Sequence, residues 1–230
     1  MLRFPEVWQK VEACLDKPEL AHISLRWNRA IIRNYACNEV DYFYPPEYKD
    51  HFASPLIIAS HRNMLAAFTP NFSALMLHGA GIIRNGVAAL FFAPDEGGKS
   101  SAIKLAAGAP VLNDDQIILR KQAGTVIAYG TPFGQVTSGP IQSKLGAIFM
   151  LEKSSHFALS PLPASAAVEF VWNEHNHLWV IMPRSLRINA FGLIVDACQQ
   201  ARIYRLQFQK NYINWNAIDD AIAGASSLAG

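Results

Sequence analysis

The residues best suited to chemistry form a glycine-containing stretch near the middle of the chain. An apolar run, residues 87–92, precedes it, and residues 99–107 have the spacing of a short helix that Gly108 ends. A strand, a glycine turn and a Gly-Lys-Ser start of a helix are the context of a phosphate-binding loop. There, successive backbone N–H groups form a concave site for an anion. The stretch reads Ala93-Pro94-Asp95-Glu96-Gly97-Gly98-Lys99-Ser100-Ser101.

Each part of this stretch has a use in holding a nucleotide. The predicted binding residues are Gly97, Gly98, Lys99, Ser100 and Ser101. In such a loop the lysine reaches the β- and γ-phosphates, and the first hydroxyl takes one position on Mg²⁺. The simpler interpretation is a turn followed by the start of a helix.

The match to the pattern is imperfect in two ways. Ala93 stands where the pattern has its first glycine, and Asp95 and Glu96 add two carboxylates to a loop meant for a polyanion. Two like charges 4 Å apart repel by about 1 kcal/mol in water and about 4 kcal/mol at an effective dielectric constant near 20. These side chains must therefore point away from the phosphates, be protonated or hold a cation.

Two further features could complete a reactive site. Asp114 and Asp115 follow an apolar strand start, where a carboxylate can hold Mg²⁺ or accept the proton of an attacking hydroxyl. An acidic turn is the alternative for an isolated Asp-Asp pair. His78 lies in an apolar strand before the loop, and residue type alone favours a satisfied core histidine there.

Together these motifs resemble the catalytic domain of HPr kinase/phosphorylases and the looser group of HPr-kinase-like proteins in the phosphoenolpyruvate-carboxykinase fold superfamily. The resemblance is closest over residues 75–134 and is one of pattern only in the last third of the chain. It implies an α/β fold with a mixed sheet and a phosphate loop between strand and helix. The residues that carry it are Leu77-His78-Gly79, Gly98-Lys99-Ser100 and Asn113-Asp114-Asp115.

The resemblance also implies roles for the site residues, with ATP and Mg²⁺ as cofactors. Lys99 would bind the phosphates, and Ser100 and Asp114 would hold the metal. His78 would pair with Asp114 or Asp115, and the sequence leaves open which of the two is the base. In such a pair the carboxylate accepts a proton from a serine hydroxyl while the imidazole orients it and tunes its pKa.

The chain departs from that family after the aspartate pair. The segment of residues 130–135, Gly-Thr-Pro-Phe-Gly-Gln, has no acidic residue where the family has a glutamate-containing signature. This segment is either a structural turn or a substrate loop. HPr is therefore not the expected substrate, and the resemblance leaves open whether the chain forms a homo-oligomer.

Two functions are consistent with these residues. The first is a Mg²⁺- and ATP-dependent phosphotransferase acting on a hydroxyl of a protein, peptide or small molecule other than HPr. The second is a non-catalytic accessory or regulatory protein that binds a nucleotide or another anion on the same fold.

Several other elements are expected to position the site. Strands are predicted at residues 75–83, 125–129, 145–151 and 203–208, with a type I′ turn at Asn85-Gly86, and helices at 185–200 and 214–223. Residues 71–230 would form the main domain, and residues 1–70 an α+β lead-in packed on it. That lead-in is predicted to have helices at 4–15 and 56–68, a strand at 23–27 and a turn at 42–46. The Pro-, Ala- and Ser-rich segment after 151 has no assigned element. His175 and His177 lack a third metal ligand nearby, which favours a solvated loop.

Composition excludes several classes of protein. Hydrophobic residues make up 51% of the 230 residues, which is too many for a disordered chain. The net charge of +2 without a basic stripe argues against a nucleic-acid partner. No apolar run approaches the roughly 20 residues that cross a membrane. There is no signal-peptide pattern, and the scattered Cys14, Cys37 and Cys198 suggest no disulfide framework, so a cytoplasmic location is expected.

Overall fold

The computed structural model describes residues 65–106, 108–136 and 142–224, three earlier segments at 21–26, 29–35 and 39–43, and the single residues Gln9 and Glu12. The chain divides into two compact units. One contains residues 1–72 and 177–188, and the other contains residues 73–176 and 189–230. Among the described residues, no helix combines the length and the apolar character needed to cross a bilayer.

The first unit contains a small antiparallel sheet. Its strands are β1 (Ala21–Arg26), β2 (Arg29–Asn34) and β3 (Glu39–Phe43), in the order β1-β2-β3. Buried Tyr35 stacks on Phe68 with 4.8 Å between ring centroids, and its hydroxyl donates to the carbonyl of Ile181 at 2.6 Å.

Sequence predictions for this unit were right in part. The strand around residues 23–25 is confirmed, whereas Tyr42 and Phe43, predicted to lie in a turn, are the last residues of β3. Aromatic residues favour the extended chain, and both pair with residues of β2. Residues 65–68 are helical and are followed by a 3₁₀ turn, η3 (Thr69–Phe72). Gln9 and Glu12, inside the helix predicted for residues 4–15, are helical. The rest of that prediction and those for residues 27, 44–46 and 56–64 lie outside the described residues.

The second unit is built on a nine-stranded mixed sheet, as the predicted α/β class requires. Its order is β4-β8-β9-β10-β6-β5-β7, with β12 beside β10 and β11 beside β12. The long strand β10 joins its halves, because residues 142–144 pair antiparallel with β9 and later residues pair parallel with β6 and β12. The strands are β4 (Ala74–His78), β5 (Ala80–Arg84), β6 (Val87–Phe92), β7 (Val111–Asn113), β8 (Gln116–Gln122), β9 (Thr125–Gly130), β10 (Gln142–Lys153), β11 (Ala158–Pro161) and β12 (Arg202–Phe208).

The predicted single strand over residues 75–83 is two strands that separate at Gly79. Before it, β4 pairs with β8; after it, β5 pairs with β6 and β7. A Cβ at Gly79 would lie 2.7 Å from the ring of Phe92, so only glycine fits where the chain crosses over. The crossover places His78 at the end of β4. The turn after β5 is confirmed as type I′, since Asn85 and Gly86 have φ of 51° and 77°.

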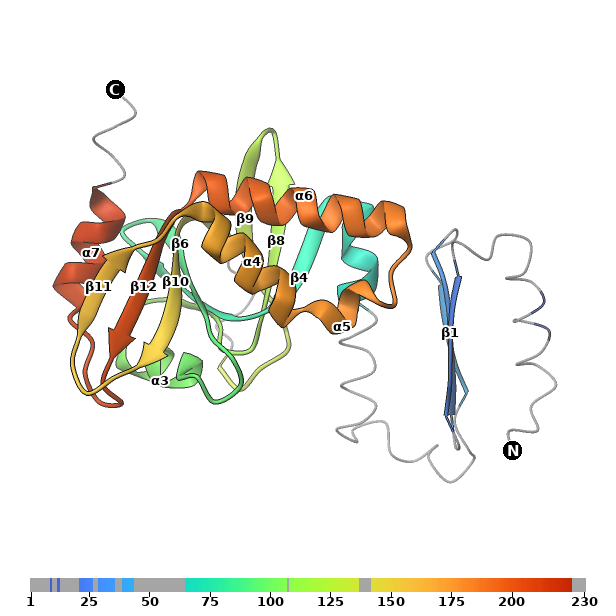
Figure 1. Ribbon diagram of the computed structural model, residues 1–230, viewed down its shortest axis with the longest axis horizontal. Coiled ribbons are helices and arrows are strands. Elements are labelled where there is room, and N and C mark those ends of the chain that lie inside the picture. The colour runs from blue at the N-terminus through green and yellow to red at the C-terminus, as the bar shows by residue number, and fades with distance from the viewer. Residues whose placement is uncertain are drawn as a thin grey trace. The chain divides into compact units, whose positions relative to one another are not determined.

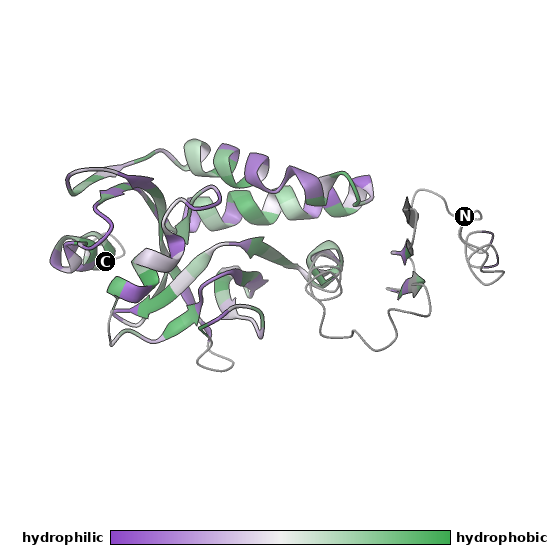
Figure 2. Cartoon of the chain, turned by 90° about the horizontal axis from the view of Figure 1, so that it is seen from below, coloured by the Kyte–Doolittle hydropathy of each residue, from purple (hydrophilic) through white to green (hydrophobic). Residues whose placement is uncertain are grey.

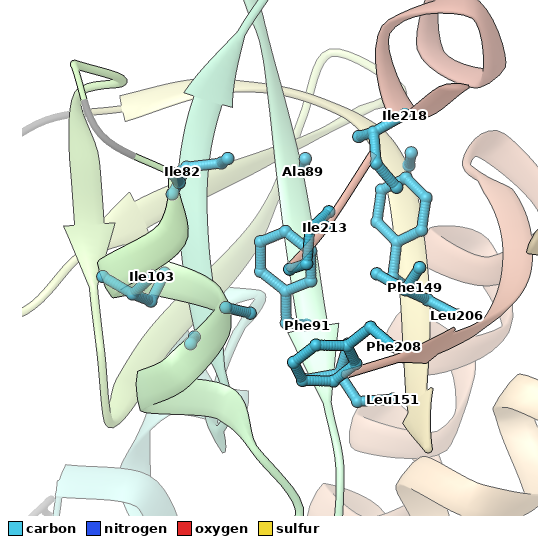
Figure 3. Packing of buried hydrophobic residues seen from close by; sticks show 14 of the residues in the cluster. Ile82, Ala89, Phe91, Ile103, Phe149, Leu151, Leu206, Phe208, Ile213 and Ile218 are labelled. Carbon is cyan, nitrogen blue, oxygen red and sulfur yellow. The ribbon is translucent and has the colours of Figure 1, made fainter. Parts of the chain in front are cut away.

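Helices cover both faces of this sheet. On one face, α3 (Lys99–Leu105) and α7 (Trp215–Ala223) pack on a core that includes Phe91, Phe149 and Phe208 (Figure 3). On the other face lie α4 (Ala164–Glu174) and α6 (Arg184–Gln200), as Figures 1 and 2 show. The short α5 (Asn176–Trp179) connects them.

The segment without an assigned element therefore contains β11 and α4. Pro163 caps the start of α4 in an extended conformation, and the alanine-rich sequence after it favours a helix. The predicted helices at 185–200 and 214–223 are confirmed as α6 and α7, with the side chain of Asn214 capping α7.

Candidate functional site

The glycine loop, residues 93–98, connects the end of β6 to the start of α3. The N–H of Gly97 donates to the carbonyl of Pro94 at 2.9 Å, which closes a turn. Gly98 has a φ of 104°, and a Cβ there would lie 2.7 Å from the ring of Phe208. Its left-handed conformation and its contact with the core both require glycine. The predicted sequence of strand, turn and helix start is therefore present.

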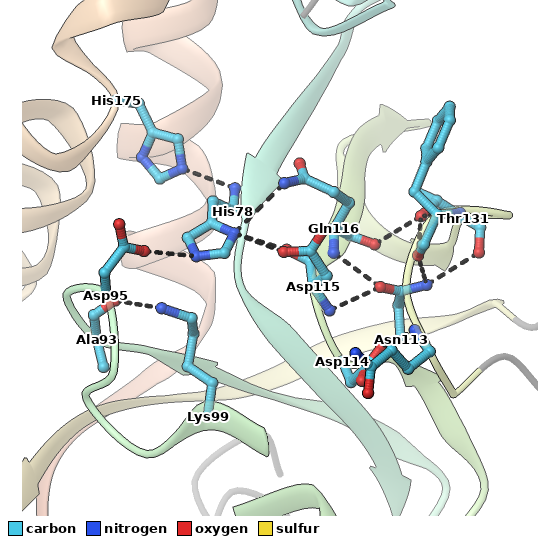
Figure 4. Close-up of polar contacts among 12 residues, drawn as sticks. His78, Ala93, Asp95, Lys99, Asn113, Asp114, Asp115, Gln116, Thr131 and His175 are labelled. Atoms are coloured by element: carbon cyan, nitrogen blue, oxygen red, sulfur yellow. Dashed lines mark hydrogen bonds and ion pairs between the residues drawn. The ribbon is translucent and has the colours of Figure 1, made fainter. Parts of the chain in front are cut away.

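Lys99 lies at the first position of α3, with its side chain turned back into the glycine loop. Its Nζ donates to the carbonyl of Ala93 at 2.7 Å (Figure 4) and to that of Pro94 at 3.1 Å. Burial lowers the pKa of this ammonium, and nearby carboxylates, Asp95 first among them, oppose that shift. Lys99 is thus hydrogen-bonded to the backbone of its own loop.

A second segment, the carboxylate turn of residues 113–116, is organised by the buried side chain of Asn113. Its Oδ1 accepts from the N–H groups of Asp115 at 2.8 Å and Gln116 at 2.7 Å. Its Nδ2 donates to the carbonyls of Thr131, at 2.9 Å, and Phe133. One amide therefore fixes the backbone of both the turn and the segment of residues 130–135.

The segment of residues 130–135 wraps around Asp114. Oδ1 of Asp114 accepts from the N–H groups of Gln135 at 2.9 Å and Val136 at 3.2 Å. A Cβ at Gly134 would lie 2.5 Å from that same oxygen. The segment therefore turns around Asp114, and its Gly134 and Gln135 also line the cavity.

His78 lies between two carboxylates rather than in the core. Its Nδ1 is 3.0 Å from Oδ1 of Asp115 and 3.0 Å from the carbonyl oxygen of the same residue. Its Nε2 is 3.4 Å from Oδ1 of Asp95. Because a carbonyl can only accept a hydrogen bond, we assign the proton of the neutral ring to Nδ1. The side-chain amide of Gln116 lies 3.3 Å from the same nitrogen. Of the two aspartates, Asp115 is the one that pairs with His78.

His175 was missed by the sequence analysis, which placed it in a solvated loop. It is the C-cap residue directly after α4, is 1% exposed, and its Nε2 accepts from the backbone N–H of His78 at 2.7 Å (Figure 4). The error follows from the missed helix, because the alanine-rich spacing over 164–174 would have placed His175 at its buried end. In the parts of the chain that the structure describes, no three His, Cys, Asp or Glu side chains are grouped to hold a metal ion.

A cavity of about 400 Å³ brings many of these side chains together. Four of its lining side chains are carboxylates, against one lysine and one histidine. Such a lining repels a polyanion unless a cation accompanies it. Of the predicted site residues, His78, Lys99, Ser100, Asp114 and Asp115 line the cavity, whereas Gly97, Gly98 and Ser101 do not. The full lining is His78, Asp95, Glu96, Lys99, Ser100, Asp114, Asp115, Gly134 and Gln135.

Comparisons with known proteins give little beyond this geometry. No protein-family model matches the sequence, and no curated protein matches it. Among solved structures, the HPr(Ser) kinase/phosphatase from Coxiella burnetii overlaps 66% of this chain and 96% of its own, with 11% sequence identity and a TM-score of 0.33. Overlap at this level does not establish a family for the chain.

Proposed function

We propose that this protein is a Mg²⁺- and ATP-dependent phosphotransferase with an HPr-kinase-like fold and phosphate loop. The observation that carries the proposal is the convergence of Lys99, Ser100 and the Asp115–His78 pair on one cavity. A cation for phosphate, a hydroxyl for a metal and an oriented carboxylate are the parts that transfer to a hydroxyl requires.

The nucleotide would be held by the glycine loop. Phosphate oxygens would replace the carbonyls of Ala93 and Pro94 as partners of the Lys99 ammonium. Ser100 and Asp114 offer oxygen ligands at the cavity wall, and Mg²⁺ typically takes one or two protein oxygens with phosphates and waters. Bound there, Mg²⁺ would offset the excess of carboxylates and spread the charge of the phosphates.

Asp115 is the group proposed to receive the proton. Its backbone is fixed by Asn113, and its carboxylate is oriented by Nδ1 of His78. The acceptor hydroxyl, a serine or its equivalent, would transfer its proton to this carboxylate as its oxygen bonds to the γ-phosphorus. The bond from that phosphorus to the β–γ bridging oxygen would break, and ADP would leave. The acceptor would be carried by a protein, peptide or small molecule other than HPr.

The alternative is a protein on the same fold that binds a nucleotide or anion without transfer. It is favoured by one feature, the carboxylates of the glycine loop. Asp95 and Glu96 line the cavity, and Asp95 already contacts Nε2 of His78. In this alternative His78 and Asp115 hold the loop in place instead of activating a hydroxyl.

Binding is tested first, by thermal unfolding with and without MgATP. A ligand at about 100 times its dissociation constant adds about 2.7 kcal/mol to the free energy of unfolding. We expect a rise in Tm for the wild type and none for Lys99→Ala. Lys104→Ala is the matched control, since Lys104 is exposed on the same helix. If MgATP does not raise the Tm of the wild type, the protein does not bind this nucleotide. The phosphotransferase would then be contradicted, and so would the nucleotide-binding form of the alternative.

Transfer is tested second, with γ-labelled ATP and a mixture of peptides and cell extract as acceptors. The phosphotransferase is expected to label an acceptor, and Asp115→Asn is expected to abolish labelling while keeping the MgATP-induced rise in Tm. Binding without any labelling by the wild type would favour the alternative.

A further inference from the structure

The structure contains a buried imidazole next to the site that the proposed reaction does not use. His175 is the C-cap residue of α4, and both of its ring nitrogens have hydrogen-bond partners. Its Nδ1 is 2.7 Å from the carbonyl oxygen of Val171, and its Nε2 is 2.7 Å from the backbone nitrogen of His78. Because a carbonyl only accepts and an amide only donates, the proton of His175 must be on Nδ1 and the lone pair on Nε2. This ring fits its place only as one neutral tautomer.

The hydrogen bond from His78 falls where the sheet changes direction. His78 is the last residue of β4, which is at the end of the order of described strands. The next N–H along the chain, that of Gly79, points to the other side and donates to the carbonyl of Asp115 at 3.0 Å. Two consecutive amides are therefore held from opposite sides. The carboxylate turn holds the amide of Gly79, and His175 holds the amide of His78.

These two anchors fix the backbone from which the His78 ring projects. The same Asp115 carbonyl lies 3.0 Å from Nδ1 of that ring, and the Asp115 carboxylate lies 3.0 Å from it as well. A shift of the His78 backbone would therefore change the distance between the imidazole and the carboxylate. Misplacing a reacting group by about 1 Å can lower a rate about 100-fold.

We infer that His175 is a positioning residue for the reaction, one that holds the backbone of His78 so that its imidazole orients the Asp115 carboxylate. This inference rests on the proposed function, since it gives His175 a role in a transfer step. The N–H···N hydrogen bond between His78 and His175, on which it depends, can be tested without measuring activity.

The hydrogen bond is tested on the wild-type protein by ¹⁵N NMR. A scalar coupling across the hydrogen bond between the His78 amide nitrogen and Nε2 of His175 is expected, with the chemical shift of Nε2 showing that it carries no proton. The amide of His78 should also exchange slowly with solvent. A protonated Nε2, or a rapidly exchanging His78 amide, would overturn the inference whatever the activity.

The role in transfer is tested with two substitutions. His175→Leu removes the acceptor, and His175→Gln keeps an acceptor oxygen near the position of Nε2. We expect His175→Leu to lower kcat by about 10- to 100-fold with KM for MgATP changed less than threefold. His175→Gln should restore most of kcat. His156→Leu, at an exposed histidine, is the matched control and should match the wild type.

The outcomes separate this inference from the proposed function. No transfer by the wild type would overturn the proposed function and this role together, and the NMR coupling would still report the hydrogen bond. Transfer by the wild type with His175→Leu equally active would overturn the positioning role alone. A rise in KM with kcat unchanged would do so too, because it would place His175 in nucleotide binding. If His175→Leu fails to fold, the activity of His175→Gln and the wild-type coupling decide.

Discussion

The glycine loop and the carboxylate turn face the same cavity but are held in different ways. The carboxylate turn is held by side chains on several sides, with Asn113 making four hydrogen bonds and Asp114 making two. The glycine loop is held by its own backbone, by Lys99 and by the contact of Asp95 with Nε2 of His78 at 3.4 Å, and the Asp95 side chain is 94% exposed. We therefore expect the carboxylate-turn wall of the cavity to be rigid and the glycine-loop wall to rearrange at lower cost.

This difference fits what the proposed phosphoryl transfer would require of each wall. An oriented carboxylate must stay in place through the reaction, so the cost of ordering it is met during folding. In the proposed function, the glycine loop would exchange the internal hydrogen bonds of Lys99 for bonds to the ligand. Lys99 has two carbonyl partners that phosphate oxygens could replace. The partners of Asn113 are all backbone groups of the protein, two of them in the buried residues Gln116 and Thr131.

The largest effect is expected at Asn113. Asn113→Ala leaves two N–H groups, one of them buried, and two carbonyls without their partner, so the free energy of unfolding should fall by about 3–5 kcal/mol. Urea unfolding measures this, with Asn173→Ala as control because Asn173 is exposed on α4. A loss below about 1 kcal/mol would mean that the carboxylate turn is not held more firmly than the glycine loop.

A smaller effect is expected at Gly98, and it can be divided into two parts. Gly98→Ala meets a strained φ of 104° and a contact of 2.7 Å with Phe208, so it should cost about 2–3 kcal/mol. Gly108→Ala is the matched control, because Gly108 has a φ of 85° with nothing within 4 Å. It should cost about 1 kcal/mol, from strain alone. Equal losses in urea unfolding would show that Phe208 moves aside, which would extend the adjustable wall into the core.

The sequence predicted the elements around both walls better than it predicted how they are held. The strand, turn and helix of residues 87–105 follow from an apolar run, glycines and helix composition, all of which are local. The pairing of His78 with Asp115 instead of Asp114 depends on the side-chain amide of Asn113, whose partners lie up to 20 residues away along the chain. From the sequence, Asn113 was identified only as part of the motif Asn113-Asp114-Asp115, without a role of its own.

The hydrogen bond of His175 to His78 was harder still to predict from the sequence. His175 contacts a residue 97 positions earlier, and no local spacing predicts such a contact. The helix α4 itself could have been predicted from the sequence, because residues 164–171 are rich in alanine and valine and follow a proline that suits a helix start. The break at Gly79 was also missed, since two strands separated by one glycine have the same apolar pattern as one long strand.

The smallest effect concerns the charge of Lys99 and how pH changes it. Burial lowers the pKa of Lys99 below its usual 10.5, so the folded chain gives up this proton before the unfolded chain does. Between the folded pKa and 10.5 the unfolded state binds more protons, and stability rises with pH by at most about 1.4 kcal/mol per pH unit from this group. Lys99→Met removes that rise. The free energy of unfolding of the wild type minus that of Lys99→Met should therefore increase as the pH is raised from 7 toward 10.5.

Urea unfolding at a series of pH values measures this difference. Cys198 provides the background, because burial raises its pKa to about 12, so its unfolded thiol ionises first and stability is lost above about pH 9. That loss is common to both proteins and cancels in the difference. A difference that stays flat between pH 7 and 10.5 would show that the ammonium is as well solvated in the folded chain as in the unfolded one. The glycine loop would then already be open around Lys99, and the contrast between the two walls would be sharper still.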